Sequence, residues 1–298
     1  MTESSSAARP DGAGPGVAAA VRAAAERLSA AGVPDPLVDA ELLLAHLRRQ
    51  SRGEVQAAVV RGDVLTAGEA QQYEVLVARR AAREPLQHIT GLAPFRHLEL
   101  AVGPGVFVPR PETESVAQLA IDALRASPGG EPVGVDLGTG SGAIALAMAT
   151  EVPHARVHAV EKSPHAFVWA KENARRVGAP NLRLVHADLA VALPELDGTV
   201  DVVASNPPYV PDDAIPRDPE VRLHDPEMAL YGGADGLDVV RALSRTALRL
   251  LRPGGTLVIE HGELQGTAIR DLLTADGWRA AATHPDLTLR DRATTAVR

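Results

Sequence analysis

From residue 133 onward, the sequence alternates short apolar runs with longer segments of helical periodicity. The runs that we expect to form strands are Val133–Leu137, Arg156–Glu161, Leu182–Ala187, Val200–Ser205 and Thr256–Glu260. Helices are expected between them, at about residues 142–150, 164–178 and 235–251. Such alternation predicts a parallel sheet with helices on both faces, because each parallel connection must cross over the sheet. The last stretches, "WRAAATHPDL" and "RATTAVR", would add a closing hairpin of two strands.

The part of the chain before this alternation has a different character. Apolar side chains recur at helical spacing from Val17 to Leu28, and Thr66 with Glu69 makes a capping box before another such stretch. The segment after residue 84 is rich in proline and glycine. We therefore expect the following division: a disordered polar tail over 1–16, a small helical domain over 17–84, a linker with a β-hairpin over 85–111, and the strand–helix domain over 112–298.

Composition excludes several classes of protein. There is no cysteine, which rules out disulfides, thiolate metal sites and a cysteine nucleophile. The histidines do not have metal-ligand spacing, so we expect no metal site. No run of about 18 apolar residues predicts a membrane span, and the N-terminus lacks the apolar core of a signal peptide, so we expect a cytoplasmic protein. The net charge of −8 argues against direct binding of nucleic acid.

A glycine-rich turn separates the first expected strand of the alternation from its helix, in "VGVDLGTGSGAIALAMA". Gly138, Gly140 and Gly142 permit tight turning and a close approach of a ligand to the backbone. The helix that follows offers free N–H groups at its N-terminus. Spacing alone leaves two alternatives open: a loose nicotinamide-dinucleotide fingerprint, and a turn that needs glycine for its conformation alone.

Three acidic residues favour another cofactor. Asp136 ends the first strand, where a carboxylate would repel a pyrophosphate but attract a cation. S-adenosyl-L-methionine carries a sulfonium and an ammonium group and has no phosphate. Glu161 ends the second strand, where an acid can accept both ribose hydroxyls. Asp188 ends the third strand and could accept a hydrogen bond from the adenine amino group.

The fourth strand stops abruptly at Asn206-Pro207-Pro208-Tyr209. Its end should lie at the same edge of the sheet, facing the methyl group of the cofactor. The Asn206 side-chain oxygen and the Pro207 carbonyl can each accept one N–H of a planar NH₂ group, whose nitrogen is a weak nucleophile. The prolines stiffen the turn, and Tyr209 offers a flat face for a planar substrate. Catalysis would consist of positioning and hydrogen bonding to the transition state.

These motifs, taken together and in order, resemble a known family. "FVPRPETE", "DLGTGSGAIALA", "SNPPYV", "HDPEMALYGGADGLD" and "LRPGGTLVIEHGE" are similar to the peptide chain release factor glutamine N5-methyltransferases, the HemK/PrmC family. The resemblance implies a Rossmann-like S-adenosylmethionine-dependent methyltransferase domain preceded by a small all-helical domain that recognises the substrate. It also implies that class I release factors are the partners, methylated on the glutamine of their Gly-Gly-Gln motif.

The resemblance assigns roles to individual positions. The catalytic residues would be Asn206, Pro207 and Tyr209. Cofactor binding would involve Asp136, Gly138, Thr139, Gly140, Ser141, Gly142, Glu161, Asp188, Leu189 and Asn206. Substrate binding would involve Arg110, Glu112 and Thr113 at the mouth of the site, together with Asn206, Pro207, Pro208 and Tyr209.

Three positions depart from the family pattern. Leu189 replaces an aromatic found in some relatives, Glu161 replaces the commoner aspartate, and Leu289 stands where glycine is frequent. The Asn-Pro-Pro-Tyr motif alone also fits a DNA or RNA amino-N-methyltransferase. The acidic net charge argues against that alternative. So does the lack of a large insertion that could serve as a target-recognition domain. Asp136 argues against a nicotinamide-dependent oxidoreductase, and the intact Asn206 with three strand-end acids argues against an inactive binding module.

Overall fold

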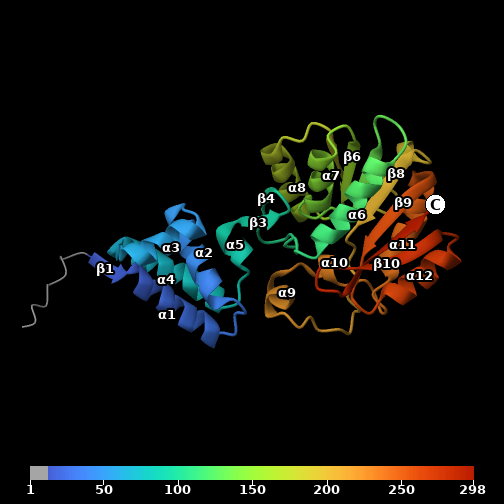
Figure 1. The fold of residues 1–298 in the computed structure, drawn as a ribbon. Coiled ribbons are helices and arrows are strands. Elements are labelled where there is room, and N and C mark those ends of the chain that lie inside the picture. Colours follow the sequence, from blue (N-terminus) through green and yellow to red (C-terminus); the bar gives the residue numbers. More distant parts are fainter. Residues whose placement is uncertain (1–12) are drawn as a thin grey trace, which may run out of the picture. The chain divides into compact units, whose positions relative to one another are not determined.

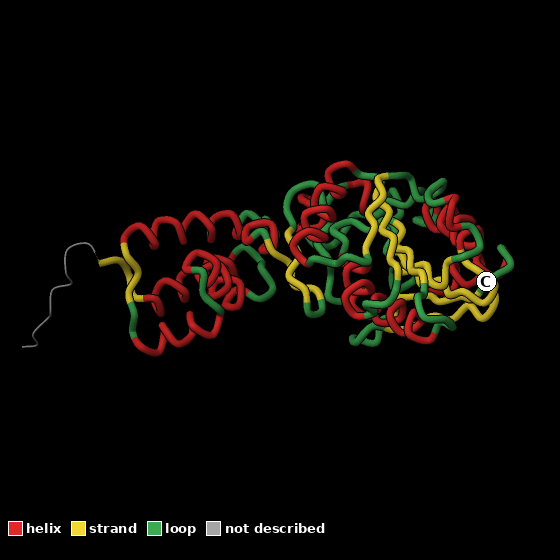
Figure 2. The backbone as a smooth tube through the Cα atoms, turned by 90° about the horizontal axis from the view of Figure 1, so that it is seen from above, coloured by secondary structure: helices red, strands yellow, loops and turns green. Residues whose placement is uncertain are grey.

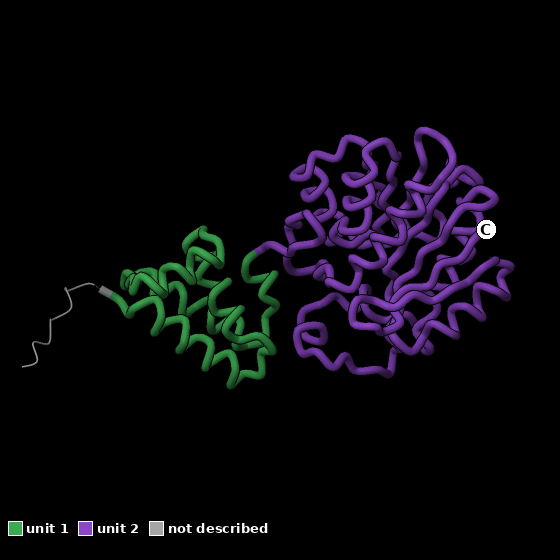
Figure 3. The backbone as a smooth tube through the Cα atoms, viewed as in Figure 1, with its two compact units in different colours: residues 1–90 green, residues 91–298 purple. Residues whose placement is uncertain are grey.

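The computed structural model describes residues 13–298, which divide into two compact units at the boundary between Thr90 and Gly91 (Figure 3). The predicted disordered tail lies outside the described residues up to residue 12. Its last four residues, Ala13–Gly16, are not a tail but strand β1. They pair with β2 (Val64–Thr66). The polar composition of the segment, which predicted disorder, gave no sign of this backbone pairing.

Helix makes up most of the first unit (Figure 2). Its helices are α1 (Val17–Ala30), α2 (Pro36–Arg48), α3 (Arg52–Arg61), α4 (Ala67–Ala81) and α5 (Leu86–Thr90). The expected capping box of Thr66 and Glu69 starts α4. A second capping box, Ser51 with Glu54, starts α3 and was not predicted from the sequence. Only two side chains of α3 are buried among the described ones, Val55 and Ala58, so its apolar periodicity is weak.

Two buried carboxylates in this unit are matched by arginines. Arg80 Nε lies 2.7 Å from Asp39 Oδ2, and both side chains are nearly inaccessible to solvent. Arg52 Nε lies 2.6 Å from Glu41 Oε2, which also accepts a hydrogen bond from Gln56 at 3.1 Å. Each of these acids therefore has a cationic partner, which is buried at Asp39 and solvent-exposed at Glu41.

The second unit begins with the expected hairpin. Strand β3 (Leu92–Phe95) pairs antiparallel with β4 (Leu98–Ala101), and α6 (Thr113–Ala126) follows. The fully buried Asn173 of α8 (Pro164–Val177) joins this hairpin to the glycine turn. Its side chain accepts from Ala101 N at 2.6 Å and donates to Ala101 O and Ser141 O at 3.0 and 2.9 Å.

A seven-stranded sheet forms the centre of the second unit (Figure 1). Its order is β10-β11-β9-β8-β5-β6-β7, with β11 antiparallel to both of its neighbours and the other pairs parallel. The strands are β5 (Val133–Leu137), β6 (Arg156–Glu161), β7 (Leu182–His186), β8 (Val200–Ser205), β9 (Leu251–Glu260), β10 (Arg279–Pro285) and β11 (Asp291–Val297). The predicted parallel sheet with its closing hairpin is confirmed.

Helices cover both faces of this sheet, as predicted. Alternate strand residues point to opposite faces, so Val202 and Ala204 pack with α6 and α7 (Ala143–Glu151), while Val203 packs with α11 (Asp238–Leu250) and α12 (Gly266–Ala275). Two short helices, α9 (Pro219–His224) and α10 (Glu227–Leu230), lie in the long segment between β8 and α11. No helix within residues 13–298 combines the length and apolarity needed to cross a membrane.

The turn between β10 and β11 contains the departure at Leu289. This leucine has a φ of 63°, in the left-handed region that favours glycine, and its side chain is exposed. The replacement of glycine by Leu289 raised the question whether this turn forms. The turn does form, and Leu289 adopts a backbone conformation that is more favourable for glycine. Asp286 stabilises it by accepting hydrogen bonds from Thr288 N at 2.7 Å and Arg290 N at 3.2 Å.

Candidate active site

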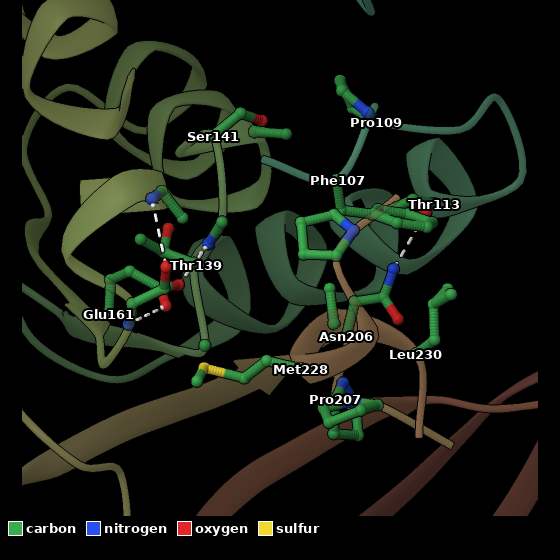
Figure 4. A pocket seen from close by; sticks show the side chains of 18 of the residues that line it. Phe107, Pro109, Thr113, Thr139, Ser141, Glu161, Asn206, Pro207, Met228 and Leu230 are labelled. Carbon is green, nitrogen blue, oxygen red and sulfur yellow. Dashed lines mark hydrogen bonds between the residues drawn. The ribbon is translucent and has the colours of Figure 1, made fainter. Parts of the chain in front are cut away.

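A cavity of about 260 Å³ lies at the carboxyl edge of the sheet, where β5, β6 and β8 end. Most of the predicted site residues line it: Arg110, Glu112, Thr113, Asp136, Gly138, Thr139, Gly140, Ser141, Glu161, Leu189, Asn206, Pro207, Pro208 and Tyr209. Figure 4 shows several of them facing this space. Gly142 and Asp188 are the two predicted residues that do not line it.

Three glycines in the left-handed backbone conformation form the turn between β5 and α7. Gly138, Gly140 and Gly142 have φ values of 77°, 59° and 89°, a conformation that other residues rarely adopt. A Cβ at Gly138 or Gly140 would meet no atom within 4 Å, so the space beside them is open. A Cβ at Gly142 would lie 3.2 Å from Leu146 Cδ1, so this glycine permits tight packing of the turn on its helix.

Asp136 is buried beneath this turn. Its Oδ2 accepts hydrogen bonds from Thr139 Oγ1 at 2.6 Å and from Ala145 N at 3.1 Å. Its Oδ1 has no hydrogen-bond partner among the described residues. Burial raises the pKa of Asp136 to about 7, and the Thr139 and Ala145 donors oppose this effect. The site thus contains a carboxyl group with one unused acceptor atom that favours a nearby positive charge.

Glu161 is held by backbone groups on both sides. Its Oε2 accepts from Gly140 N at 2.8 Å and its Oε1 from Ser163 N at 2.7 Å (Figure 4). Burial raises the pKa of Glu161, while these backbone hydrogen bonds lower it. Because each carboxylate oxygen has about two acceptor positions, both oxygens can still accept a further hydrogen bond. The glutamate side chain, which is longer than that of the commoner aspartate, therefore joins the glycine turn to the end of β6.

Asp188 is placed differently from the other two strand-end acids. It lies outside the cavity, and its side chain is partly exposed. Its oxygens already bind Ala190 N at 2.9 Å and the Lys162 ammonium at 2.9 Å, and the Ala190 contact lowers its pKa most. Leu189, its neighbour, does line the cavity and offers an apolar surface there.

Asn206 begins the turn that ends β8. Its Nδ2 donates to Thr113 Oγ1 at 3.4 Å, which orients the amide so that Oδ1 points away from Thr113 (Figure 4). The preceding Ser205 donates to Leu137 O at 2.6 Å and ties β8 to β5. After the two prolines, Gln265 donates to Tyr209 O at 2.8 Å. The turn is therefore fixed by contacts with α6, with β5 and with the N-cap of α12.

Tyr209 lines the cavity, but its hydroxyl points into the protein. The hydroxyl lies 3.5 Å from Glu260 Oε1, and burial raises its pKa. Glu260 ends β9 and is itself 1% exposed, with Oε2 lacking a partner among the described residues. Burial raises the pKa of Glu260 to about 7. Glu260 is not among the residues predicted from the sequence, although it ends the fifth expected strand, as Asp136, Glu161 and Asp188 end the first three.

The segment between β8 and α11 supplies further lining that the sequence did not identify, from Val221, Pro226, Met228, Ala229 and Leu230. Arg110 connects to this segment by donating to the buried Asp225 at 2.7 Å, and its guanidinium lies 5.1 Å from the centre of the Phe107 ring. Phe107 also lines the cavity. Among residues 13–298, no cluster of three or more metal-ligating side chains occurs.

Comparisons with known proteins agree with this arrangement. The model of the PrmC N-terminal domain matches residues 19–91, and that of the methyltransferase small domain matches residues 97–218. The release factor glutamine methyltransferase of Streptomyces coelicolor is 54% identical over 93% of this chain and 96% of its own. The 4-amino-L-phenylalanine/4-methylamino-L-phenylalanine methyltransferase of Streptomyces pristinaespiralis is 41% identical over 96% of each chain. A methyltransferase structure from Pyrococcus furiosus is 20% identical, with a TM-score of 0.50 and coverage of 76% and 97%, which reflects a shared fold.

Proposed function

This chain belongs to the release factor glutamine methyltransferase family and is an S-adenosylmethionine-dependent methyltransferase, and we propose that it methylates the glutamine of the Gly-Gly-Gln motif in class I peptide chain release factors. The acceptor atom is the side-chain amide nitrogen. The reaction takes place in the cytoplasm and modulates the termination of translation. The protein needs no contact with nucleic acid for this.

The residues around the cavity fit the cofactor. S-adenosylmethionine supplies an electrophilic methyl group on a positively charged sulfur. The unused Oδ1 of Asp136 and the open space beside Gly138 and Gly140 suit a cationic ligand lying on the turn. Glu161 retains acceptor capacity for ribose hydroxyls. Leu189 offers an apolar contact for adenine. The oxygens of Asp188 already bind Ala190 N and Lys162, so Asp188 contributes only at the border of the site.

The Asn206 turn handles the acceptor amide. Asn206 Oδ1 and the Pro207 carbonyl each accept one N–H of the glutamine amide and thereby aim its nitrogen at the methyl group. The hydrogen bond from Asn206 Nδ2 to Thr113 keeps the oxygen available for this role. Phe107, Met228 and Leu230 add apolar walls that strengthen these hydrogen bonds by excluding water. Arg110 and Glu112 border the mouth through which the glutamine side chain enters.

The observation that supports this proposal most is the identity of 54% over 93% of the chain, since it covers the helical unit as well as the catalytic one. We propose that the helical unit recognises the release factor. The sequence motifs with chemical roles all follow Pro109, and a folded protein substrate needs a docking surface beyond the cavity.

A second acceptor is supported by the relative that methylates 4-amino-L-phenylalanine, which matches this chain along almost its whole length. An aromatic amine has a delocalised lone pair, as an amide does, and the same two oxygens could orient it. We favour the release factor because of the higher identity to that family.

The test is to incubate the full chain with S-adenosylmethionine and each acceptor separately, and then to locate added methyl groups by mass spectrometry. The acceptors are a class I release factor, the same factor with its motif glutamine changed to alanine, 4-amino-L-phenylalanine and a nucleic acid. We expect one methyl group on the motif glutamine and none on the alanine variant. Methylation of the amino acid or the nucleic acid alone would refute the proposal.

A further inference from the structure

Three leucines at the carboxyl edge of the sheet are almost fully exposed. Leu264 lies in the turn after β9, and Leu287 and Leu289 lie in the turn between β10 and β11. Their exposed fractions are 90%, 96% and 85%. A single exposed apolar side chain is common on a protein surface, but several on adjoining turns indicate a contact surface. We call these three side chains the leucine rim.

The two turns that contain the leucine rim are neighbours. Residues 261–265 follow β9 and residues 286–290 precede β11, and these two strands pair antiparallel. Beyond the paired residues, Arg290 Nε lies 3.9 Å from Glu263 Oε2 and joins one turn to the other. Each of these two charged residues is next in sequence to a leucine of the rim. The rim therefore occupies one region of the sheet edge.

The backbone at Leu289 is unfavourable for a leucine. Its φ of 63° is in the left-handed region, which glycine adopts more easily. Because the side chain is 85% exposed, its packing within the chain offsets little of this cost. Backbone strain of this kind clusters at functional sites. Leu289 is therefore better explained by a contact with another molecule than by the stability of the turn.

The turn that follows β9 packs directly on the Asn206 turn. Gln265 Nε2 donates to Tyr209 O at 2.8 Å, and Gln265 Oε1 accepts from Gly262 N at 2.9 Å. A Cβ at Gly262 would lie 3.8 Å from Tyr209 Cδ2, so the backbone there lies close to the tyrosine ring. The leucine rim is thus continuous with the part of the site that handles the acceptor amide.

The order of the sheet divides its carboxyl edge into two halves. The glycine turn and Glu161, which fit the cofactor, lie at the ends of β5 and β6, and the Asn206 turn lies at the end of β8. On the other side of β8, the edge is formed by β9, β11 and β10, whose turns carry the leucine rim. A cavity of about 260 Å³ can hold a side chain but not a folded protein. The chain that flanks the acceptor must therefore lie outside the cavity, and the half of the edge opposite the cofactor is adjacent to Asn206.

We propose that the leucine rim is a docking surface for the protein substrate, against which apolar side chains near the acceptor glutamine pack when its amide enters the cavity. This inference rests on the proposed transfer to a release factor and adds the place where that protein contacts the catalytic unit. A protein is the expected occupant because its chain continues beyond the reacting side chain and across the sheet edge. The small acceptor 4-amino-L-phenylalanine has no such continuation and would not need the rim.

The experiment measures methylation of an intact class I release factor by the wild-type chain and by the triple variant Leu264→Ser, Leu287→Ser, Leu289→Ser. We expect the KM for the release factor to rise at least about tenfold, because docking then removes less apolar surface from water. The kcat at saturation and the Kd for S-adenosylmethionine should change little. The control is the double variant Val168→Ser, Val191→Ser, which removes exposed aliphatic side chains from α8 and from the loop after β7. Its KM should equal that of the wild type.

A second variant, Leu289→Gly, separates docking from folding. Glycine adopts the left-handed conformation more easily, so the melting temperature should be equal to that of the wild type or higher. The KM for the release factor should nevertheless rise, because the leucine side chain is missing. Thermal unfolding and steady-state kinetics measure the two changes on the same preparation. A role of Leu289 in the turn alone predicts an unchanged KM.

The outcomes separate this inference from the proposed function. If the triple variant methylates the release factor with the KM of the wild type, the docking role is overturned and the proposed function stands. An equal rise of KM in the valine variant overturns the docking role as well, because the effect would not depend on the position of the side chains. If the wild-type chain methylates no release factor, the proposed function fails and the inference fails with it. If the triple variant does not fold, Leu264→Ser and Leu289→Gly decide by the same comparison.

Discussion

In the helical unit, the buried Asp39 lies 2.7 Å from Arg80, and the buried Glu41 lies 2.6 Å from Arg52. At the carboxyl edge of the sheet, Asp136 and Glu260 are still more buried, but their hydrogen bonds come from neutral groups. Each of the latter retains an oxygen without a partner among the described residues.

The difference separates two uses of a buried charge. An acid that is paired with arginine inside a core belongs to the fold, since removal of either partner leaves the other uncompensated. An acid that is buried without a hydrogen-bonded cation has a raised pKa and unused acceptor atoms, which is an arrangement found at functional sites. Changes in the first region should therefore alter stability, and changes in the second should alter binding and turnover.

The largest effect should come from breaking a pair in the helical unit. Arg80→Met leaves the Asp39 carboxylate buried without a cation, which should lower the free energy of unfolding by about 3–5 kcal/mol. Urea unfolding of the full chain measures this loss, and cofactor affinity should remain unchanged. The double variant Asp39→Leu with Arg80→Met should regain most of the stability, because an apolar pair can replace an ion pair. No regain would contradict the structural role of the pair.

At the carboxyl edge of the sheet, Asn206→Ala should lower the turnover number. It removes the oxygen that accepts the substrate N–H, and loss of one such hydrogen bond costs about 2.7–4 kcal/mol, or roughly a hundredfold to a thousandfold in kcat. Steady-state methylation of the release factor measures it; the melting temperature should stay nearly constant, and cofactor affinity should change far less than kcat. Asn206→Asp, which keeps an acceptor, should retain more activity than Asn206→Ala. Equal turnover of Asn206→Ala and wild type would remove Asn206 from the mechanism.

Glu161→Gln should weaken cofactor binding. The substitution keeps the shape of the side chain but loses a charged acceptor, which is worth about 1.5–3 kcal/mol, or roughly tenfold to a hundredfold in Kd. Isothermal titration calorimetry with S-adenosylmethionine measures the change. Asp188→Asn is the matched control and should weaken binding less, because Asp188 lies outside the cavity. The reverse order would show that the third strand end contributes more than the second.

The smallest effect concerns pH and Asp136. Its folded pKa of about 7 exceeds the ordinary value of 3.8, so its contribution to stability is fully present at pH values below about 4 and is lost as the pH rises through 7. Asp136→Asn removes this loss and should be more stable relative to wild type at pH 8 than at pH 5, by about 1–2 kcal/mol. This is less than the whole pKa difference would give, because buried sites relax around a charge. Thermal unfolding at both pH values tests it. An equal difference at both values would contradict a raised pKa.

Local sequence was sufficient to predict the glycine turn and the Asn206 turn. Both motifs lie where a strand ends, and the carboxyl ends of parallel strands share one edge of a sheet. The same rule applied to Asp188 was incomplete, because it could not foresee that Ala190 and Lys162 would engage the carboxylate. Their contacts depend on the conformation of the loop after β7.

The remaining lining depended on tertiary contacts that the sequence pattern does not encode. Met228 and Leu230 belong to a segment with little periodicity, and its approach to the site is fixed by pairs such as Arg110 with Asp225, which are far apart in the chain. Helix α11 begins at Asp238, later than expected, because left-handed turns at Gly233 and Gly236 precede it. Strand β1 was missed because its partner, β2, lies some 50 residues further along the chain.

The position of β11 in the sheet affects how the chain folds during its synthesis on the ribosome. This strand comes last in the sequence, yet it lies between β9 and β10. Until residues 291–297 have been synthesised, β10 has no neighbour in the sheet and one edge of β9 stays unpaired. Arg292, which flanks Glu260, arrives with the same strand. A nascent chain therefore passes through a stage with an open apolar strand edge, at which it is open to aggregation and to capture by chaperones.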